Sequence, residues 1–309
     1  MNNAQKTLLI TGSQGFTSIY LRDVFLKEGY AVWGLVKNNP REWEVAADIT
    51  DKVALRDAIA NIAPSYVIHL AGVSNVVHEN SSALYAINCL GTLNLLDVLQ
   101  EKNIEIKKII LASSAYVYGN YKHEENEKEA NLISETVCPK PINHYAMTKL
   151  SMEYMALSLY PNLPIVITRP FNYTGFGQQN YVLVPKILHH FVTKAPKILL
   201  GNTHVYREFN DVRMVVEAYK GLLHHAEPGT LVNICSGKSY SLKEILTLCS
   251  EISQHTLDVE RDEKLVRKNE PSHLSGDPTL LHSIVPNLPC YSLEDTLRWM
   301  YDKSINPSN

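Results

Sequence analysis

A tyrosine and a lysine, Tyr145 and Lys149, stand four positions apart in the stretch NHYAMTKL. If this stretch is helical, the two side chains lie on one face of the helix, one turn apart. A positive charge near a phenol favours the phenolate, so the pair predicts a tyrosine that exchanges a proton near neutral pH. The alternative is a surface helix whose tyrosine packs and whose lysine is solvated.

A glycine-rich stretch, TGSQGFTS, follows the first apolar run and opens a helical segment. Gly12 allows a tight turn, and Gly15 lets the backbone approach a pyrophosphate at the positive end of the helix. The third glycine of this dinucleotide-binding pattern is replaced by Ser18, which is also small. We expect a dinucleotide to bind here, with contacts from Gln14 and Phe16 as well; a turn without a ligand is the alternative.

The end of the second apolar run bears on which dinucleotide binds. A carboxylate there would accept hydrogen bonds from a bare ribose, whereas a basic residue suits a 2′-phosphate. The stretch VWGLVKNN presents Lys37 and no carboxylate. This favours NADP as the cofactor, with NAD as the alternative, although a lysine at a strand end is also commonly just solvated.

Two later segments are candidates for the rest of the cofactor site. Asp48, followed by Ile49, is placed either to accept the adenine amino group or to cap the next helix. After the third long apolar run, Leu70 precedes two small residues, Ala71 and Gly72. Their size leaves room for a cofactor, or serves packing alone.

Short apolar runs alternate with helical stretches through the first half of the chain. This alternation predicts an α/β fold with a doubly wound parallel sheet, the Rossmann fold. After Pro170 the runs become shorter and more polar, so we expect a Rossmann domain over residues 1–170 and a smaller C-terminal α/β substrate lobe over 171–309. The segment 211–234, a helix and then TLVNIC, is a candidate to return to the sheet.

Composition limits the class of protein. The 309 residues carry a net charge of −3, which gives no basic excess for nucleic acid, and no unbroken apolar run suits a membrane span. We expect a cytoplasmic protein because the first residues do not resemble a signal peptide. The five cysteines are scattered and predict reduced thiols, and the histidine pairs at 189–190 and 224–225 lack the spacing of a metal site.

The motifs TGSQGF, HLAGVSNV, NCLGTLNLL, LASSAYVYG, HYAMTK and RPFNYTGFGQ occur in this order over almost the whole chain. Together they resemble the extended short-chain dehydrogenases/reductases, the NAD(P)-dependent nucleotide-sugar epimerases, dehydratases and reductases. FNYTGFGQ, REFNDVR and NICSGKSYSLKEIL are most similar to the branch of GDP-4-keto-6-deoxymannose reductases and GDP-mannose 4,6-dehydratases.

The resemblance implies a catalytic set. Ser114 would hydrogen-bond the reacting sugar oxygen, Tyr145 would exchange the proton, and Lys149 would bind the nicotinamide ribose and lower the pKa of the tyrosine. Ser114 is chosen over its neighbour Ser113 because it stands directly before AYVYG. A serine that only caps a strand end is the alternative.

The substrate implied by the resemblance is a nucleotide-diphosphate sugar. A diphosphate suits arginine and lysine partners, since the planar guanidinium matches phosphate oxygens. The candidates for the substrate site, with Ser114, are Ser74, Asn172, Lys186, Arg207 and Arg267. Solvated surface side chains are the alternative for the basic residues.

The chemistry stays open among three possibilities. The dehydratases of this family have an acidic pair after the active-site serine or threonine, but Ala115 and Tyr116 stand here, which disfavours dehydration. The leading hypothesis is an NADP-dependent reductase of a 4-keto-6-deoxy sugar, and a 4-epimerase is the alternative. A non-catalytic dinucleotide sensor represents a different class. Apolar residues in LSMEYMALSLY favour a homodimer, although core packing explains them equally well.

Overall fold

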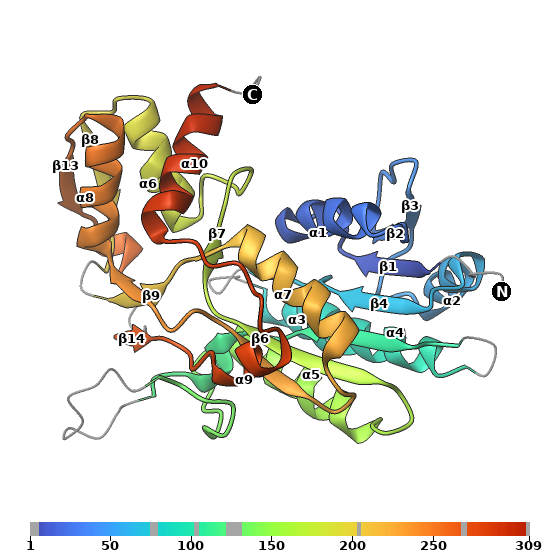
Figure 1. Ribbon diagram of the computed structural model, residues 1–309. Coiled ribbons are helices and arrows are strands. Elements are labelled where there is room, and N and C mark those ends of the chain that lie inside the picture. Colours follow the sequence, from blue (N-terminus) through green and yellow to red (C-terminus); the bar gives the residue numbers. More distant parts are fainter. Residues whose placement is uncertain are drawn as a thin grey trace.

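The centre of the molecule is a seven-stranded parallel sheet. A computed structural model describes residues 6–74, 80–101, 105–121, 132–202, 205–266 and 271–306. The strand order is β11-β6-β5-β4-β1-β2-β3 (Figure 1). The strands are β1 (Thr7–Thr11), β2 (Ala31–Val36), β3 (Glu44–Ala46), β4 (Tyr66–His69), β5 (Lys108–Ala112), β6 (Ile165–Pro170) and β11 (Leu231–Ile234).

Helices cover both faces of this sheet. One face carries α1 (Phe16–Lys27), α7 (Val212–His225) and α9 (Thr279–Ile284), and the other carries α2 (Lys52–Ile62), α4 (Thr92–Leu99) and α5 (His144–Ser158). The inner strands are apolar along their length because both of their faces are buried. The predicted doubly wound fold is therefore confirmed.

The strand order reverses at β1, which lies between β2 and β4. At this reversal Thr11 and His69 lie side by side at the ends of their strands. In open α/β sheets the ligand crevice forms outside the carboxyl ends of the strands at such a point. The glycine-rich turn after β1, the loop after β4 and the serines after β5 thus emerge at one edge.

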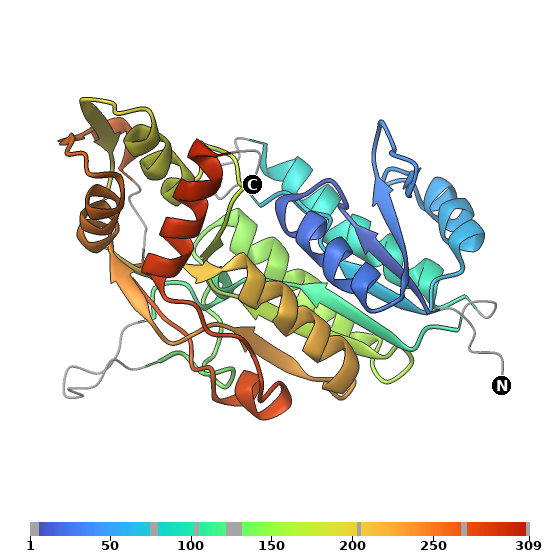
Figure 2. The same cartoon turned by 45° about the horizontal axis from the view of Figure 1, so that its top comes forward.

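A smaller lobe stands at one end of the sheet (Figures 1 and 2). Its own apolar core is formed largely by β8 and the three helices α6 (Leu183–Val192), α8 (Leu242–Ser253) and α10 (Leu293–Ile305). The short strands of this part of the chain are β7 (Tyr173–Thr174), β8 (Lys197–Leu200), β9 (Tyr206–Glu208), β10 (Asn210–Asp211), β12 (Ser239–Ser241), β13 (Asp258–Arg261) and β14 (His273–Leu274), with the 3₁₀ turn η3 (Glu263–Leu265). A further 3₁₀ turn, η2 (Ala115–Tyr118), follows β5.

The chain visits the sheet again after entering the lobe. Helix α7 packs against α1, and β11 pairs in parallel with β6 at the edge of the sheet. Residues 212–234 therefore lie with the sheet, between two segments that belong to the lobe. We propose that the substrate lobe comprises the rest of 171–309 apart from α9, which packs on the sheet.

The helical run Ser81–Leu99 joins α3 (Ser81–Tyr85), the π-helical turn η1 (Ala86–Gly91) and α4. Among the described residues, this run has the length and apolar composition of a membrane span. Half of it is buried inside the fold, where it contacts α2 and α5. Core helices of soluble proteins share this composition, so it is weak evidence for a membrane.

Helix α5, which carries Tyr145 and Lys149, begins at His144. The Asn143 side chain sets this start, since its oxygen accepts a hydrogen bond from the backbone N–H of Ala146 at 2.8 Å. The short strand β3 was not predicted, because three residues give too little periodicity.

Candidate active site

The glycine-rich turn has the conformation that its sequence predicts. Gly12 has a φ of +69°, and a Cβ on it would lie 2.9 Å from the Cα of Ala71. Gly15 caps α1 without a side-chain hydrogen bond to the first turn. Ser18, which replaces the third glycine, donates from Oγ to the carbonyl oxygen of Gly12 at 2.8 Å. The substitution therefore braces the turn rather than disrupting it.

A buried carboxylate that the sequence analysis missed lies beside this turn. Glu44 on β3 accepts hydrogen bonds from Ser13 Oγ at 2.8 Å, Gln14 Nε2 at 2.9 Å and the Arg41 backbone N–H at 2.8 Å. Burial opposes its ionisation, but these hydrogen bonds outweigh burial and hold the pKa of Glu44 below its ordinary value. Gln14 is thus held by Glu44 and by the carbonyl of Asn39.

The two residues predicted for the adenosine end form an ion pair. Lys37 Nζ lies 2.8 Å from Asp48 Oδ2. The hydrogen bond from Lys37, followed by the hydrogen bonds from the backbone and side chain of Thr50, lowers the pKa of Asp48 to about 2. The helix-cap alternative for Asp48 is wrong, because Asp51 caps α2 by accepting from the backbone of residues 53 and 54. Ile49 is buried nearby.

The loop after β4 is pinned to the opposite helices. Asn88 on η1 accepts from the backbone N–H of Val73 at 2.8 Å and donates to Thr148 Oγ1 at 3.0 Å. A Cβ on Gly72 would lie 2.9 Å from Asn88 Oδ1 and 3.6 Å from Lys149 Nζ. The absence of a side chain at Gly72 therefore leaves room for the side chains of Asn88 and Lys149. The sequence analysis did not predict the contact with Asn88. Leu70 lies partly buried and Ser74 is exposed.

The structure brings the three predicted catalytic residues together. Tyr145 and Lys149 are both buried on α5, and Tyr145 forms a hydrogen bond with Ser114 at the end of β5. Ser114 Oγ also accepts from the backbone N–H of Tyr116 at 3.2 Å. The neighbouring Ser113 points elsewhere and donates to Glu153.

Burial controls the acid strength of the tyrosine. It raises the pKa of Tyr145 to about 12, while the hydrogen bond with Ser114 acts in the opposite direction. Burial also lowers the pKa of Lys149 to about 8, and its Nζ donates to the carbonyl of Ala112 at 2.7 Å. The resemblance implied that Lys149 lowers the pKa of Tyr145, but the net effect of the protein's own groups is to raise it. Tyr145 is a protonated phenol at neutral pH.

A second tyrosine links this set to the glycine-rich turn. Tyr173 on β7 is hydrogen-bonded to Thr17 Oγ1 at 2.7 Å, and its ring stacks on Phe16 with centroids 6.3 Å apart. Phe16, predicted to contact the cofactor, also packs against Tyr20. The charge state of Tyr173 influences Tyr145, so the two lie in one environment. No local sequence pattern indicated this contact, because Thr17 and Tyr173 lie 156 positions apart.

The predicted substrate residues have separate partners. Lys186 Nζ donates to the carbonyl of Leu199 at 2.7 Å, and the carbonyl of Asn172 accepts from the backbone N–H of Asn210 at 2.9 Å. Arg207 is buried rather than solvated and donates to the backbone carbonyls of residues 206 and 271. Arg267 lies outside the described residues.

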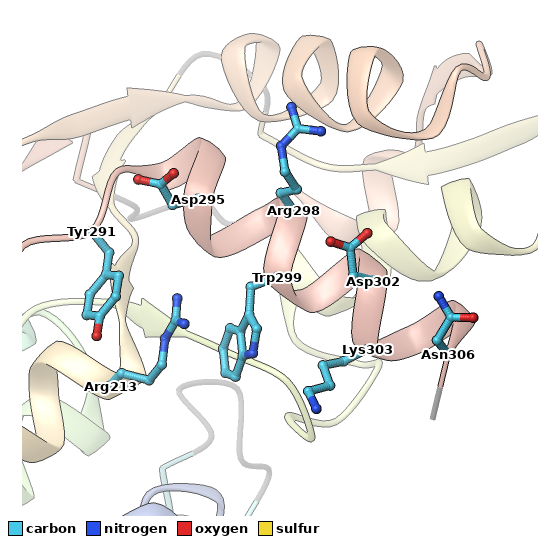
Figure 3. Close-up of a pocket in the computed structure, with 8 residues that line it drawn as sticks. All are labelled: Arg213, Tyr291, Asp295, Arg298, Trp299, Asp302, Lys303 and Asn306. Carbon is cyan, nitrogen blue, oxygen red and sulfur yellow. The ribbon is translucent and has the colours of Figure 1, made fainter. Parts of the chain in front are cut away.

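One surface hollow lies away from these residues. Its volume is about 520 Å³, and none of the residues that line it was predicted for the site (Figure 3). The Arg213 guanidinium lies between the rings of Tyr291 and Trp299, 4.2 and 4.0 Å from their centres, and forms a two-pronged pair with Asp211. Because Thr296 of α10 also donates to Asp211, this cluster fastens the lobe to α7.

All five cysteines are free thiols, with Cys138 and Cys290 exposed and the others buried. The described residues contain no group of three or more His, Cys, Asp or Glu that could hold a metal ion.

His69 lies beneath the site and should make stability depend on pH. Its Nδ1 and Nε2 are hydrogen-bonded to Thr11 at 2.7 Å and Thr92 at 2.8 Å, and burial, with the charge of Lys149, lowers its pKa to about 3. Between that value and the unfolded value of about 6.5, the unfolded chain binds a proton that the folded chain does not. The free energy of unfolding should therefore fall on acidification below about pH 6.5, by up to roughly 1.4 kcal/mol per pH unit from this residue.

Urea unfolding at several pH values checks this expectation. The comparison is His69→Gln, which retains hydrogen-bonding capacity but does not titrate. Its stability should fall less steeply as the pH is lowered. Equal slopes in the two proteins would show that His69 does not contribute.

A glycine-rich turn, a strand reversal and a buried Ser–Tyr–Lys set at one sheet edge define a dinucleotide-dependent oxidoreductase of the Rossmann class. Residues 8–235 match the model of the NAD dependent epimerase/dehydratase family. The chain belongs to this family, and it is an enzyme of the NAD(P)-dependent oxidoreductase type. The alternative of a non-catalytic sensor is set aside.

Two relatives cover nearly the whole chain. GDP-6-deoxy-D-talose 4-dehydrogenase of Aggregatibacter actinomycetemcomitans is 31% identical over 91% of both proteins. GDP-6-deoxy-D-mannose reductase of Pseudomonas aeruginosa is 30% identical over 94% of both. The chain is thus similar to enzymes that act on nucleotide-linked sugars.

Two solved structures have the same fold throughout. An epimerase candidate from Burkholderia cenocepacia J2315 superposes with a TM-score of 0.88 and 41% identity, over 96% of this chain and 97% of that one. RMD from Pseudomonas aeruginosa in complex with NADPH superposes with a TM-score of 0.84 and 28% identity, over 96% and 98% of the two chains.

Proposed function

We propose that the protein is an NADP-dependent reductase of a nucleotide-linked 4-keto-6-deoxy sugar, most similar to GDP-4-keto-6-deoxymannose reductases. The observation that carries the proposal is the buried Tyr145, protonated at neutral pH and hydrogen-bonded to Ser114. Reduction of a ketone needs a proton donor at the oxygen, and a phenol held in its neutral form supplies one. The two GDP-sugar relatives support the substrate class.

The glycine-rich turn fits a dinucleotide. A Cβ at Gly12 would clash with backbone, and the first turn of α1 has no side-chain cap, so its N–H groups are available to an anion. When bound, reduced nicotinamide supplies the hydride. In this proposal Lys149 would orient the cofactor ribose, Ser114 would hold the ketone oxygen, and Tyr145 would protonate it.

Dehydration is disfavoured by the residues that follow Ser114. Ala115 is fully buried and has no acidic group, and the Tyr116 ring lies edge-on to Tyr145 with centroids 6.3 Å apart. Neither side chain can remove a proton from a sugar carbon as a carboxylate would. The residues after Ser114 therefore support net reduction or epimerisation.

A 4-epimerase is the second candidate, because the same three residues serve it and one structural relative is an epimerase candidate. The two functions differ in what happens to the cofactor. Incubation with GDP- or dTDP-4-keto-6-deoxyhexose should consume one NADPH for each sugar if the protein is a reductase. Conversion of a nucleotide sugar to its C4 epimer without net cofactor consumption would establish the epimerase instead.

The preference for NADP is proposed to depend on Lys37. Its ammonium group is exposed and paired with Asp48, and in this proposal it would bind the 2′-phosphate. Lys37→Ala should raise the KM for NADPH by about tenfold, equivalent to roughly 1.4 kcal/mol, and leave that for NADH nearly unchanged. Lys52→Ala is the matched control, because it breaks another surface ion pair, with Asp97. A parallel change for both cofactors would contradict the assignment.

Two further expectations are also proposals. The exposed side chains Met147, Tyr154 and Leu157 on α5, with Leu90 on η1, support a homodimer formed through these helices. Light scattering of the wild type and of Tyr154→Glu should show a dimer that the charge weakens.

A cytoplasmic location is also proposed. It accords with the free cysteines, three of which are buried.

A further inference from the structure

Helix α5 carries a third functional side chain in line with the tyrosine and the lysine. Glu153 lies four residues after Lys149 and eight after Tyr145, so all three share one face of the helix. The Glu153 side chain is only 2% exposed. It forms a two-pronged ion pair with Arg169 at the end of β6, with Nε to Oε1 at 2.9 Å and Nη2 to Oε2 at 2.6 Å.

This ion pair holds both ends of the segment that contains Ser114. At the first end, the Ser113 hydroxyl donates to Glu153, and its backbone N–H donates to the carbonyl of Thr168 at 2.8 Å. At the other end, the Arg169 guanidinium lies 4.8 Å from the ring centre of Tyr118. The Tyr118 hydroxyl is fixed in turn by Asn233, at 2.7 Å.

We propose that the Glu153–Arg169 pair and Ser113 position Ser114 against Tyr145, and thereby set the geometry of the proton donor. This inference rests on the proposed function for its kinetic consequence, but not for its structural one. Glu153 joins the helix that carries Tyr145 to the strand end that carries Ser114. Ser113 is therefore a positioning residue, not a catalytic one.

The choice of a buried ion pair at this place supports a positioning role. A hydrophobic pair of similar volume is often as stable as a buried ion pair, because both charges lose their hydration. Directional hydrogen bonds add what apolar contacts do not, a defined distance between two elements. Misplacement of a reacting group by about 1 Å can cost about 100-fold in rate.

Ser113→Ala tests the inference with little risk to folding, because Glu153 keeps both bonds to Arg169. The kcat should fall by about tenfold, with KM and cofactor affinity near those of the wild type. Ser113→Thr keeps the hydroxyl and should recover most of the rate. The matched control is Ser275→Ala, which removes a buried serine that donates at 3.1 Å to another buried carboxylate, Glu208.

A crystal structure of Ser113→Ala gives a second result that does not depend on the reaction. The separation between Ser114 Oγ and the Tyr145 hydroxyl should increase relative to the wild type. An unchanged separation together with a wild-type kcat would overturn the inference while leaving the proposed function intact. If the wild type proves inactive on every keto sugar, the proposed function fails, and the separation alone decides the positioning role.

Discussion

Tyr145→Phe is expected to lower turnover of the keto sugar by about 10²- to 10⁴-fold, the range that a positioned general acid contributes. The variant loses only the hydroxyl, and the ring that packs against Tyr116 stays. Cofactor affinity should be nearly unchanged, because we propose that the glycine-rich turn and Lys149 bind the cofactor. Steady-state rates and equilibrium binding of NADPH measure the two quantities separately.

Tyr219→Phe is the control for this prediction. Tyr219 is buried on α7, and its hydroxyl accepts a hydrogen bond from Thr168 at 3.3 Å. Its loss should leave turnover close to that of the wild type. Comparable losses in both variants would indicate a structural defect rather than a missing proton donor.

The pH dependence of the reduction rate also follows from Tyr145. Because burial raises the pKa of Tyr145 to about 12, the phenol stays protonated through the neutral and mildly alkaline range. Reduction therefore should not decline through ionisation of this group before strongly alkaline pH. A decline near neutral pH that Tyr145→Phe abolishes would show that the tyrosine ionises there.

Glu153→Ala should reduce the free energy of unfolding by roughly 3–5 kcal/mol, because it leaves the Arg169 charge buried without its carboxylate partner. The Arg169 side chain is only 4% exposed. Removal of Arg169 as well, in Glu153→Ala/Arg169→Met, should restore part of the loss. Urea unfolding of the wild type and the variants measures these differences.

A second Arg–Glu ion pair, which is exposed to solvent, provides the control. Arg56 Nε lies 2.8 and 3.1 Å from the two carboxylate oxygens of Glu101, but both side chains are about four-tenths exposed. Glu101→Ala should cost less than about 1 kcal/mol, because water already solvates both charges. Equal losses at Glu101 and Glu153 would contradict the effect of burial.

Local patterns in the sequence identified the candidate catalytic residues and their relative placement. The spacing of Tyr145 and Lys149 placed both on one helix face, and Gly12 and Gly15 were placed in a turn between strand and helix. Such features involve residues a few positions apart, so backbone geometry alone fixes their relation. The alternation of strands and helices likewise predicted the layered sheet.

The acid strength of Tyr145 could not be predicted in the same way. The sequence suggested that the cation of Lys149 would lower the tyrosine pKa. In the fold, burial raises it instead, because several segments together exclude water from the phenol. Desolvation depends on the packing of the whole site, which no local spacing reports.

The helix face, the glycine turn and the family could be identified without coordinates, since these depend on neighbouring residues and ordered motifs. Only the tertiary structure placed Glu44 beside the turn, Tyr173 on Thr17, and Glu153 between Ser113 and Arg169. Each of these contacts joins residues 16 to 156 positions apart. Strand order and sheet register determine which residues meet in these contacts, so the contacts form only when the chain has folded.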